Sequence, residues 1–320
     1  MSKIKCGVIG VGYLGRFHAQ KYQLLDNATL VGICDVNPET VERVSTELNV
    51  PAFLDYHDLL AKVDAVSIAA TTQQHYEIAK ECLARGVHVL IEKPITETVE
   101  QANELITLAK HHGVKLQVGH LERFNAARLA IEEHLDNPLF IESQRLAPFN
   151  PRGADVNVVL DLMIHDIDLI HAMVNSPIKS IEAHGAPVLT KAIDIANARI
   201  VFENNAVANV TASRVSFKSE RKMRLFQSNA YISIDYQNKQ FAIFNKGQGE
   251  MFPGIPDVEQ FQSNFEKGDA LLLEIEAFLN AITHNTTPLV TGEDGREALA
   301  TAEKITQLIN EHLKNLHGQQ

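Results

Sequence analysis

KIKCGVIGVGYLGRFHAQKYQLLDNATLVGICD, the stretch from Lys3 to Asp35, decides the fold of this protein. It opens with a short apolar run that ends at Ile9, continues with three closely spaced glycines, and then becomes amphipathic. A second apolar run, from Thr29 to Cys34, stops at an acidic residue. This order predicts a strand, a tight turn, a helix, and a second strand parallel to the first.

The glycines have the spacing Gly-x-Gly-x-x-Gly of a dinucleotide-binding loop. Gly10 lets the chain turn, Gly12 lets backbone approach a pyrophosphate, and Gly15 lets the helix lie close to the strand. The free N–H groups at the helix N-terminus attract phosphates. Asp35 lies 20 residues after Gly15 and is expected to accept the ribose hydroxyls. The Asp35 carboxylate would repel a 2′-phosphate, so NAD is expected rather than NADP. For the glycine motif itself, the alternative is a tight turn that binds no ligand.

Length and composition are those of a globular protein with one large or two ordinary domains: 320 residues, 45% hydrophobic and 22% charged. The net charge is -11, and the sequence has no block of consecutive Lys and Arg residues. Both features argue against nucleic-acid or anionic-membrane partners. No apolar run approaches the roughly 20 residues of a membrane-spanning helix. The three cysteines, Cys6, Cys34 and Cys82, have no paired spacing and are interpreted as reduced packing residues of a cytoplasmic protein.

The rest of the chain predicts two different domains. Strands and helices alternate up to about residue 120, which predicts a doubly wound α/β sheet in which all strands are parallel. From about residue 139 the strands follow one another directly, which is typical of an antiparallel sheet. They are expected at 140–148, 178–186, 195–202, 207–215, 223–226, 231–235 and 240–245, with helices at 158–174, 269–283 and 293–316. We therefore expect a Rossmann domain over 1–120 and an α+β domain over 121–320, whose last helices pack back on the first domain.

Ligands of such parallel sheets bind at the carboxyl ends of the strands. Thr71 and the pair Glu92 and Lys93 follow two of these strands in the sequence. A lysine before a proline is usually a solvated loop charge. Beside a dinucleotide, Lys93 would instead hydrogen-bond the reacting oxygen and stabilise developing negative charge, with Glu92 pairing with it or orienting it.

A second group of polar residues lies in the helix expected at 158–174. Asp161, His165 and Asp168 have spacings of four and three residues, so they share one helix face. A carboxylate beside an imidazole fixes its tautomer and suits it to removing a hydroxyl proton. The alternative is a core histidine satisfied by a neighbouring acid. No further ligand lies at a convincing spacing, so no metal site is expected.

Several segments resemble the glucose-fructose oxidoreductase / inositol dehydrogenase (Gfo/Idh/MocA) family over nearly the whole chain. They are GVIGVGYLGRFHA, GICDVNPE, VLIEKPIT, VGHLERFN and DLMIHDIDL. The resemblance implies a Rossmann domain followed by an open, mainly antiparallel sheet that often supports oligomers, here a homodimer or homotetramer. It also implies that Lys93, Asp161 and His165 form the catalytic set. The cofactor residues it implies, together with those derived above, are Gly10, Gly12, Tyr13, Leu14, Gly15, Asp35, Thr71, Thr72, His75, Glu92 and Lys93.

Two segments depart from the family pattern. The usual Thr-Pro-Asn/Thr loop is Ala70-Thr71-Thr72 here, and the glycine pair before Asp-x-x-x-His is replaced by Asn157 to Leu160. The second departure resembles the branch that acts on nucleotide sugars, including UDP-N-acetylglucosamine 3-dehydrogenases. We therefore expect oxidation of a sugar hydroxyl to a ketone, with the 3-hydroxyl of a UDP-N-acetylhexosamine preferred.

Two other functions remain open on the sequence alone: a dehydrogenase of inositol or another free polyol, and a non-enzymatic NAD(P)-sensing regulator. A UDP pyrophosphate needs cations, and the candidates are Arg123, Arg145, Arg152 and Arg214. Arg123 and Arg152, together with Asp168, are the predicted substrate residues.

Overall fold

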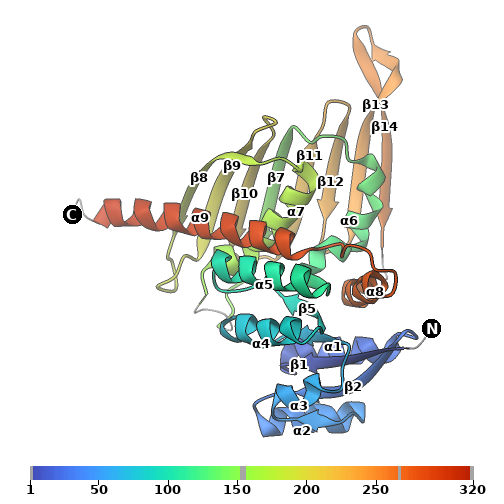
Figure 1. The fold of residues 1–320 in the computed structure, drawn as a ribbon. Helices are drawn as coiled ribbons and strands as arrows, with labels where there is room; N and C mark the ends of the chain where they lie inside the picture. Colours follow the sequence, from blue (N-terminus) through green and yellow to red (C-terminus); the bar gives the residue numbers. More distant parts are fainter. Residues whose placement is uncertain (1–2, 152–155, 266–267, 318–320) are drawn as a thin grey trace. The chain divides into compact units, whose positions relative to one another are not determined.

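The structure, a computed structural model, describes residues 3–151, 156–265 and 268–317. The chain divides into two compact units (Figure 1). The first comprises residues 1–124 and 269–296, and the second comprises 125–268 and 297–320. The helix after the second sheet therefore belongs to the first unit.

The first unit contains a six-stranded parallel sheet in the order β3-β2-β1-β4-β5-β6. Its strands are β1 (Ile4–Ile9), β2 (Ala28–Cys34), β3 (Ala52–Phe53), β4 (Ala65–Ile68), β5 (His88–Glu92) and β6 (Leu116–Gly119). The order reverses between β1 and β4, so the carboxyl ends of these two strands flank the crevice in which such sheets bind ligands. The predicted parallel, doubly wound sheet is confirmed.

Most helices of this unit connect its strands, and several begin at capping residues. They are α1 (Tyr13–Leu24), α2 (Pro38–Leu48), α3 (Tyr56–Leu60), α4 (Thr72–Ala84), α5 (Val99–His112), the 3₁₀ turn η1 (Leu121–Phe124) and α8 (Ala270–Thr283). Thr98 and Gln101 form a capping box at the start of α5, and Gly113 ends that helix in the left-handed conformation. Helix α8 contributes Ile275, Phe278 and Leu279 to the core around β1.

The second unit contains an eight-stranded sheet in the order β14-β13-β12-β11-β7-β10-β9-β8. The strands are β7 (Phe140–Leu146), β8 (Ile178–Ala186), β9 (Ile195–Phe202), β10 (Val207–Ser213), β11 (Glu220–Phe226), β12 (Ala230–Asp235), β13 (Gln240–Phe252) and β14 (Ile255–Asn264). All neighbours are antiparallel except β7 and β10, which are parallel. The expected mainly antiparallel sheet is confirmed.

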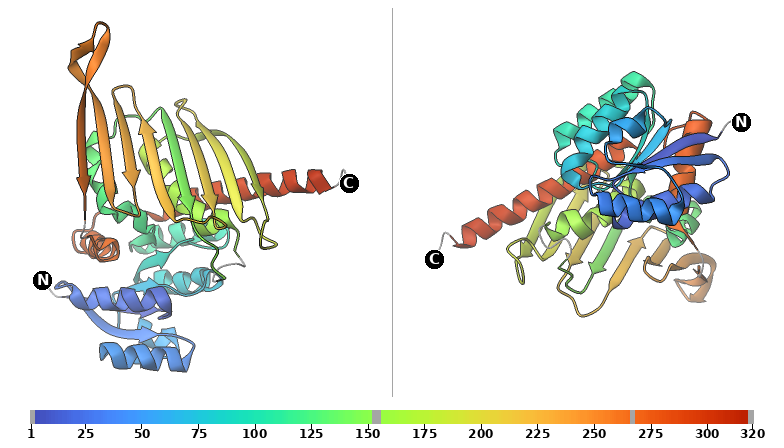
Figure 2. Two further views of the ribbon diagram at one scale, coloured as in Figure 1. Left: turned by 180° about the vertical axis from the view of Figure 1, so that it is seen from behind. Right: turned by 90° about the horizontal axis from the view of Figure 1, so that it is seen from below.

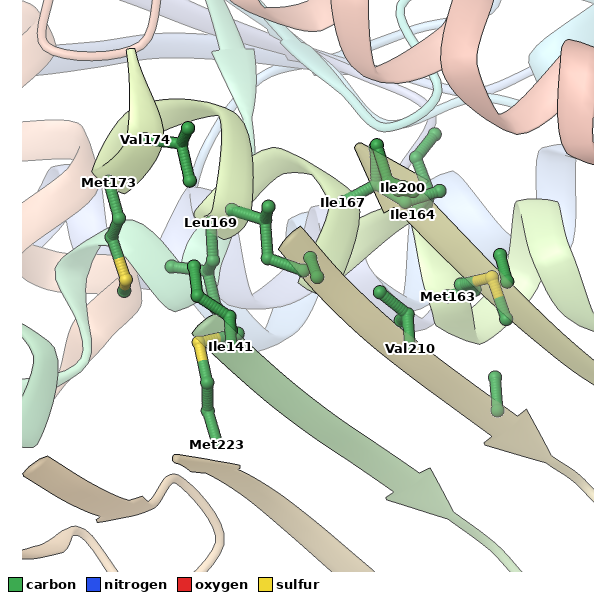
Figure 3. Packing of buried hydrophobic residues seen from close by; sticks show 14 of the residues in the cluster. Ile141, Met163, Ile164, Ile167, Leu169, Met173, Val174, Ile200, Val210 and Met223 are labelled. Carbon is green, nitrogen blue, oxygen red and sulfur yellow. The ribbon is translucent and has the colours of Figure 1, made fainter. Parts of the chain in front are cut away.

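Alternating side chains give this sheet one apolar and one polar face. Helix α7 (Ile164–Val174) covers the apolar face, where Met163 and Ile167 lie among Ile200 and Val210 of the sheet (Figure 3). The short helices α6 (Ala126–Ala130) and η2 (Glu132–His134) complete this unit together with the long α9 (Gly292–His317), which begins in the first unit. The opposite face of the sheet, seen in Figure 2 (left), is not covered by any helix of the described residues.

Two sequence-based expectations for this unit are wrong. Strand β13 runs to Phe252 rather than ending near 245, and β14 was not expected at all. The sequence of β14, IPDVEQFQSN, lacks an apolar alternation because the strand lies at the edge of the sheet and most of its side chains are exposed. The tip of this hairpin extends beyond the other strands in Figure 1.

The expected helix 158–174 is also not uniform. Residues Val159–Met163 form a π-helical turn, in which the N–H of Ile164 donates to the carbonyl of Val159, and α7 follows it. The side chain of Asn157 caps this segment by accepting from the N–H groups of Val159 and Leu160, at 3.0 Å each. Such turns are frequent at functional sites.

The three cysteines are free and buried, as expected. Burial raises the pKa of the Cys6 and Cys34 thiols to about 12, so both remain unreactive thiols at neutral pH. In the described ranges 3–151, 156–265 and 268–317, the helices lack the combination of length and apolar content that a membrane crossing requires.

Candidate cofactor and catalytic sites

The glycine loop between β1 and α1 has the geometry of a phosphate-binding turn. Gly10 has a φ of +82°, and a Cβ at Gly15 would lie 1.8 Å from the Gly10 carbonyl oxygen, so both positions require glycine for packing. Gly12 differs, because a Cβ there would meet nothing within 4 Å. Gly12 also supplies no side-chain cap to α1, so its own side chain does not block the approach of an anion to the start of that helix.

A cavity of about 340 Å³ opens beside this loop in the first unit. Its lining includes Gly10, Gly12, Asp35 and Thr71, with apolar side chains from β1, α3 and α4. One Asp35 carboxylate oxygen accepts from the N–H of Val11 at 2.9 Å, which ties the end of β2 to the glycine loop. The other oxygen accepts from the N–H of Asn37, also at 2.9 Å. Four of the predicted cofactor residues therefore line one cavity.

The other predicted cofactor residues at this edge of the sheet lie at the start of α1 and in the loop after β4. Tyr13 and Leu14 are 67% and 46% exposed at the start of α1. Thr71 is the N-cap residue of α4 and Thr72 is its first residue. These positions can contact a ligand at the helix N-termini without any rearrangement of the core.

His75 has a structural role in addition to any contact with the cofactor. It is buried, with Nδ1 2.9 Å from the Pro94 carbonyl oxygen and Nε2 3.2 Å from that of Ala70. Burial lowers the pKa of His75, against the backbone hydrogen bonds to Pro94 and Ala70 that favour its charged form. The imidazole therefore connects the loop after β4 to the loop that carries Lys93.

Glu92 ends β5 and faces a buried imidazole as well as the neighbouring Lys93. His18 Nε2 lies 2.9 Å from Glu92 Oε1. Burial alone would raise the pKa of Glu92, but the hydrogen bond from His18 and the charges of His18 and Lys93 lower it below its usual value. Glu92 is therefore an anion, and its predicted role in orienting Lys93 stays a prediction.

In the second unit, the π-turn and α7 carry Asp161, His165 and Asp168. Asp161 and His165 are half-buried, and the wide π-turn between Val159 and Met163 keeps residues four apart on nearly the same side. Asp168 is only 1% exposed. The structure thus leaves Asp161 and His165 partly accessible, whereas Asp168 lies in the interior.

Two of the four candidate arginines form ion pairs with buried carboxylates in the second unit. Arg145 Nε lies 2.7 Å from Asp166 Oδ2, and its Nη2 lies 3.2 Å from Oδ1. Arg214 Nε donates to Asp194 Oδ1 at 2.7 Å. Burial opposes the ionisation of Asp194, but backbone N–H groups and Arg214 hold its pKa well below the usual range. These arginines secure the fold, and their positive charge is neutralised.

The remaining two arginines are the predicted substrate residues. The Nη2 atom of Arg123 lies 3.7 Å from Asp294 Oδ1 within the first unit. Asp294 is also the capping partner of Thr291 at the start of α9, as the sequence indicates. Arg152 lies outside the described residues. Both arginines remain predictions as substrate residues.

Comparisons with known proteins agree with this geometry. A family model described as the oxidoreductase family with an NAD-binding Rossmann fold matches residues 4–120. A second, the GFO/IDH/MocA C-terminal domain, matches residues 132–233. The UDP-N-acetylglucosamine 3-dehydrogenase of Acidithiobacillus ferrooxidans is 40% identical over 98% of this chain and 100% of its own length.

The chain belongs to the Gfo/Idh/MocA oxidoreductase family.

Further comparisons cover one more sequence relative and two solved structures. The myo-inositol 2-dehydrogenase of Thermotoga maritima is 27% identical over 92% of this chain and 93% of that protein. A solved structure of the A. ferrooxidans enzyme superposes with a TM-score of 0.90 at 38% identity, covering 97% of this chain and 98% of that one. The scyllo-inositol dehydrogenase of Lactobacillus casei, solved with NAD(H), shares the fold with a TM-score of 0.80 at 22% identity, covering 97% and 98%. The matched family model is described as NAD-binding, so the cofactor of this oxidoreductase is NAD.

Asp35→Ala is expected to weaken NAD binding about ten- to a hundredfold, because a hydrogen bond to a charged group contributes roughly 1.5–3 kcal/mol. The same change removes the acceptor for Val11 N–H, so part of the loss arises from the loop itself. Titration of wild type and variant with NAD and NADP measures both effects. Tighter binding of NADP than of NAD to the wild-type protein would contradict the assignment of Asp35 to the ribose.

Proposed function

We propose that this enzyme oxidises the 3-hydroxyl of a UDP-N-acetylhexosamine to a ketone. The main support is the 40% identity, over the whole chain, to a UDP-N-acetylglucosamine 3-dehydrogenase. The inositol dehydrogenases that match over more than nine-tenths of this chain are less similar, at 27% identity or below. The proposed substrate residues are Arg123, Arg152 and Asp168.

The reaction removes a hydride and a proton from the same alcohol. NAD, when bound, accepts the hydride from the sugar carbon. In the proposal His165 accepts the hydroxyl proton, and Asp161 stabilises the imidazolium that results. Lys93 donates a hydrogen bond to the same oxygen and stabilises the negative charge that develops there. The products are the ketone, reduced cofactor and one proton.

The substrate is tested by incubating the protein with NAD and a panel of UDP-N-acetylglucosamine, UDP-N-acetylgalactosamine, free N-acetylglucosamine, myo-inositol and scyllo-inositol. We expect the absorbance of reduced nicotinamide to rise with a UDP-N-acetylhexosamine and not with the free sugar. A pyrophosphate bound by arginine adds charge-assisted hydrogen bonds that the free sugar cannot make. Faster turnover of an inositol would favour the second candidate function, a polyol dehydrogenase.

We also propose that the protein forms a homodimer or homotetramer through the polar face of the eight-stranded sheet, and that it is cytoplasmic. The uncovered face carries a mixed set of side chains, including Glu142 and Arg224 in an exposed ion pair at 2.7 Å. The free, buried cysteines are those of a protein that folds in a reducing compartment.

A further inference from the structure

A chain of buried hydrogen bonds in the first unit leads to Glu92, the residue before Lys93. The Tyr22 hydroxyl lies 2.9 Å from Ser67 Oγ, which lies 3.1 Å from His18 Nδ1. His18 Nε2 lies 2.9 Å from Glu92 Oε1. Tyr22, Ser67 and His18 are at most 1% exposed. Glu92 therefore has a hydrogen-bond partner on the side away from solvent as well as the charge of Lys93 beside it.

A second carboxyl group, that of Glu274 on α8, faces the same cluster. Glu274 is 0% exposed, and neither of its oxygens has a hydrogen-bond partner among the described residues. One carboxylate oxygen of Glu274, one of Glu92 and one ring nitrogen of His18 all lie within 4.8 Å of one another. A Cβ at Gly119 would lie 3.1 Å from Glu92 Oε2, so the glycine on the adjacent strand leaves the space that the Glu92 carboxylate occupies.

Two carboxylates this close in a buried site strongly disfavour the ionisation of both. Glu92 has the hydrogen bond from His18 and the positive charge of Lys93 to stabilise its anion. Glu274 has neither. Burial, and secondly the charge of Glu92, raise the pKa of Glu274 well above its usual value. The proton of the pair therefore resides on Glu274.

We propose that Glu274 is a positioning residue, a neutral carboxylic acid whose proton points at the Glu92 carboxylate and so keeps a single, oriented negative charge beneath Lys93. Glu274 touches neither substrate nor cofactor in this assignment and acts through Glu92. The inference deepens the proposed function, because it rests on the proposed role of Lys93. It adds to that function a buried acid from a helix about 180 residues away in the sequence.

The groups that face this pair come from every element packed around it. Helix α1 contributes His18 and Tyr22, the end of β5 contributes Lys93, and α4 contributes His75. The strand β6 contributes Gln117, whose Nε2 donates to the Glu274 carbonyl oxygen at 3.0 Å. The turn η1, which carries the titratable residues Glu122 and Arg123, packs on α8. Among these described residues, Lys93 is a cation whose charge acts on Glu92.

The protonation state is tested on the NAD-bound protein by infrared spectroscopy at neutral pH. We expect wild type to show the carbonyl band of a protonated carboxylic acid and Glu274→Gln to lack it. Glu276→Gln is the matched control, because Glu276 is exposed two residues further along α8, and the band must remain in this variant. Retention of the band in Glu274→Gln would overturn the proposal.

The pH dependence of stability gives an independent test. A group whose pKa is raised by folding contributes stability below its unfolded pKa and loses it as the pH rises toward the folded pKa. Relative to Glu274→Gln, the folding equilibrium constant of wild type should therefore fall by up to about tenfold per pH unit above the unfolded glutamate pKa. A difference independent of pH would overturn the proposal. So would stoichiometric zinc in the purified protein that Glu274→Gln lacks, because the three side chains would then be metal ligands.

The link to Lys93 is tested by kinetics. Glu274→Leu removes the proton donor and is expected to lower kcat by about tenfold, the value of a hydrogen bond to a charged group, with little change in KM for NAD. Glu274→Gln restores a neutral donor and should recover most of that loss, whereas Glu276→Gln should behave as wild type. Equal losses in the Leu and Gln variants would contradict positioning. If Lys93 has no catalytic role, the kinetic result fails while the infrared and stability results stand.

Discussion

Lys93→Ala and His165→Ala are each expected to lower kcat by roughly 10²–10⁴-fold, the contribution of a positioned acid–base or oxyanion-stabilising group. Lys93 follows the strand end at which Glu92 is held as an anion, and His165 lies half-buried one turn after Asp161. Neither side chain belongs to the hydrophobic cores, so both variants should fold and retain NAD binding. Steady-state kinetics with the preferred substrate, together with NAD titration, measures the two effects separately.

His171→Ala is the control for the histidine. It lies on the same helix, and its Nε2 is 2.9 Å from Thr301 Oγ1, a contact within the second unit that ties α7 to α9. This substitution should lower stability and leave kcat near the wild-type value. Turnover of His165→Ala comparable to that of His171→Ala would assign His165 to a structural role, the alternative that its sequence context leaves open.

Much of the fold follows from the sequence because local patterns and tertiary structure agree. The glycine loop, the strand that ends at Asp35 and the alternation of apolar runs with amphipathic helices give the parallel sheet without ambiguity. The edge strand β14 could not be predicted in this way. A strand that is paired on one side only and has mostly exposed side chains needs no apolar pattern. The π-turn at Val159–Met163 is likewise absent from the pattern, because one shifted hydrogen bond leaves the sequence periodicity almost unchanged.

The partners of the polar residues are even harder to predict from local sequence patterns. Arg145 and Arg214 look like candidate phosphate ligands in the sequence, but each meets a buried aspartate about 20 residues away in the chain. Local sequence cannot show which charge an arginine faces. Glu274 did leave a signal, since it is an acid within the apolar run of α8 beside Ile275 and Phe278. Its partners Glu92 and His18 come from distant segments, and only the tertiary structure brings them together.

The pair of Arg145 and Asp166 connects the stability of the second unit to the predicted catalytic histidine. Asp166 directly follows His165, and its two oxygens accept from Nε and Nη2 of Arg145 on β7. The two side chains are 3% and 2% exposed. This bidentate contact ties the first turn of α7 to the sheet, and we propose that it thereby supports the neighbouring His165.

Asp166→Ala is therefore expected to destabilise the second unit by about 3–5 kcal/mol, because it leaves a buried guanidinium without its carboxylate. Urea denaturation followed by circular dichroism measures the change. Glu81→Ala is the control for an exposed ion pair, away from the proposed oligomer face. Its partner Arg85 is 45% exposed, so the loss should be at most about 1 kcal/mol. A loss in Asp166→Ala no larger than in Glu81→Ala would mean that solvent reaches Arg145 freely, and the proposed support of His165 by this ion pair would then be wrong.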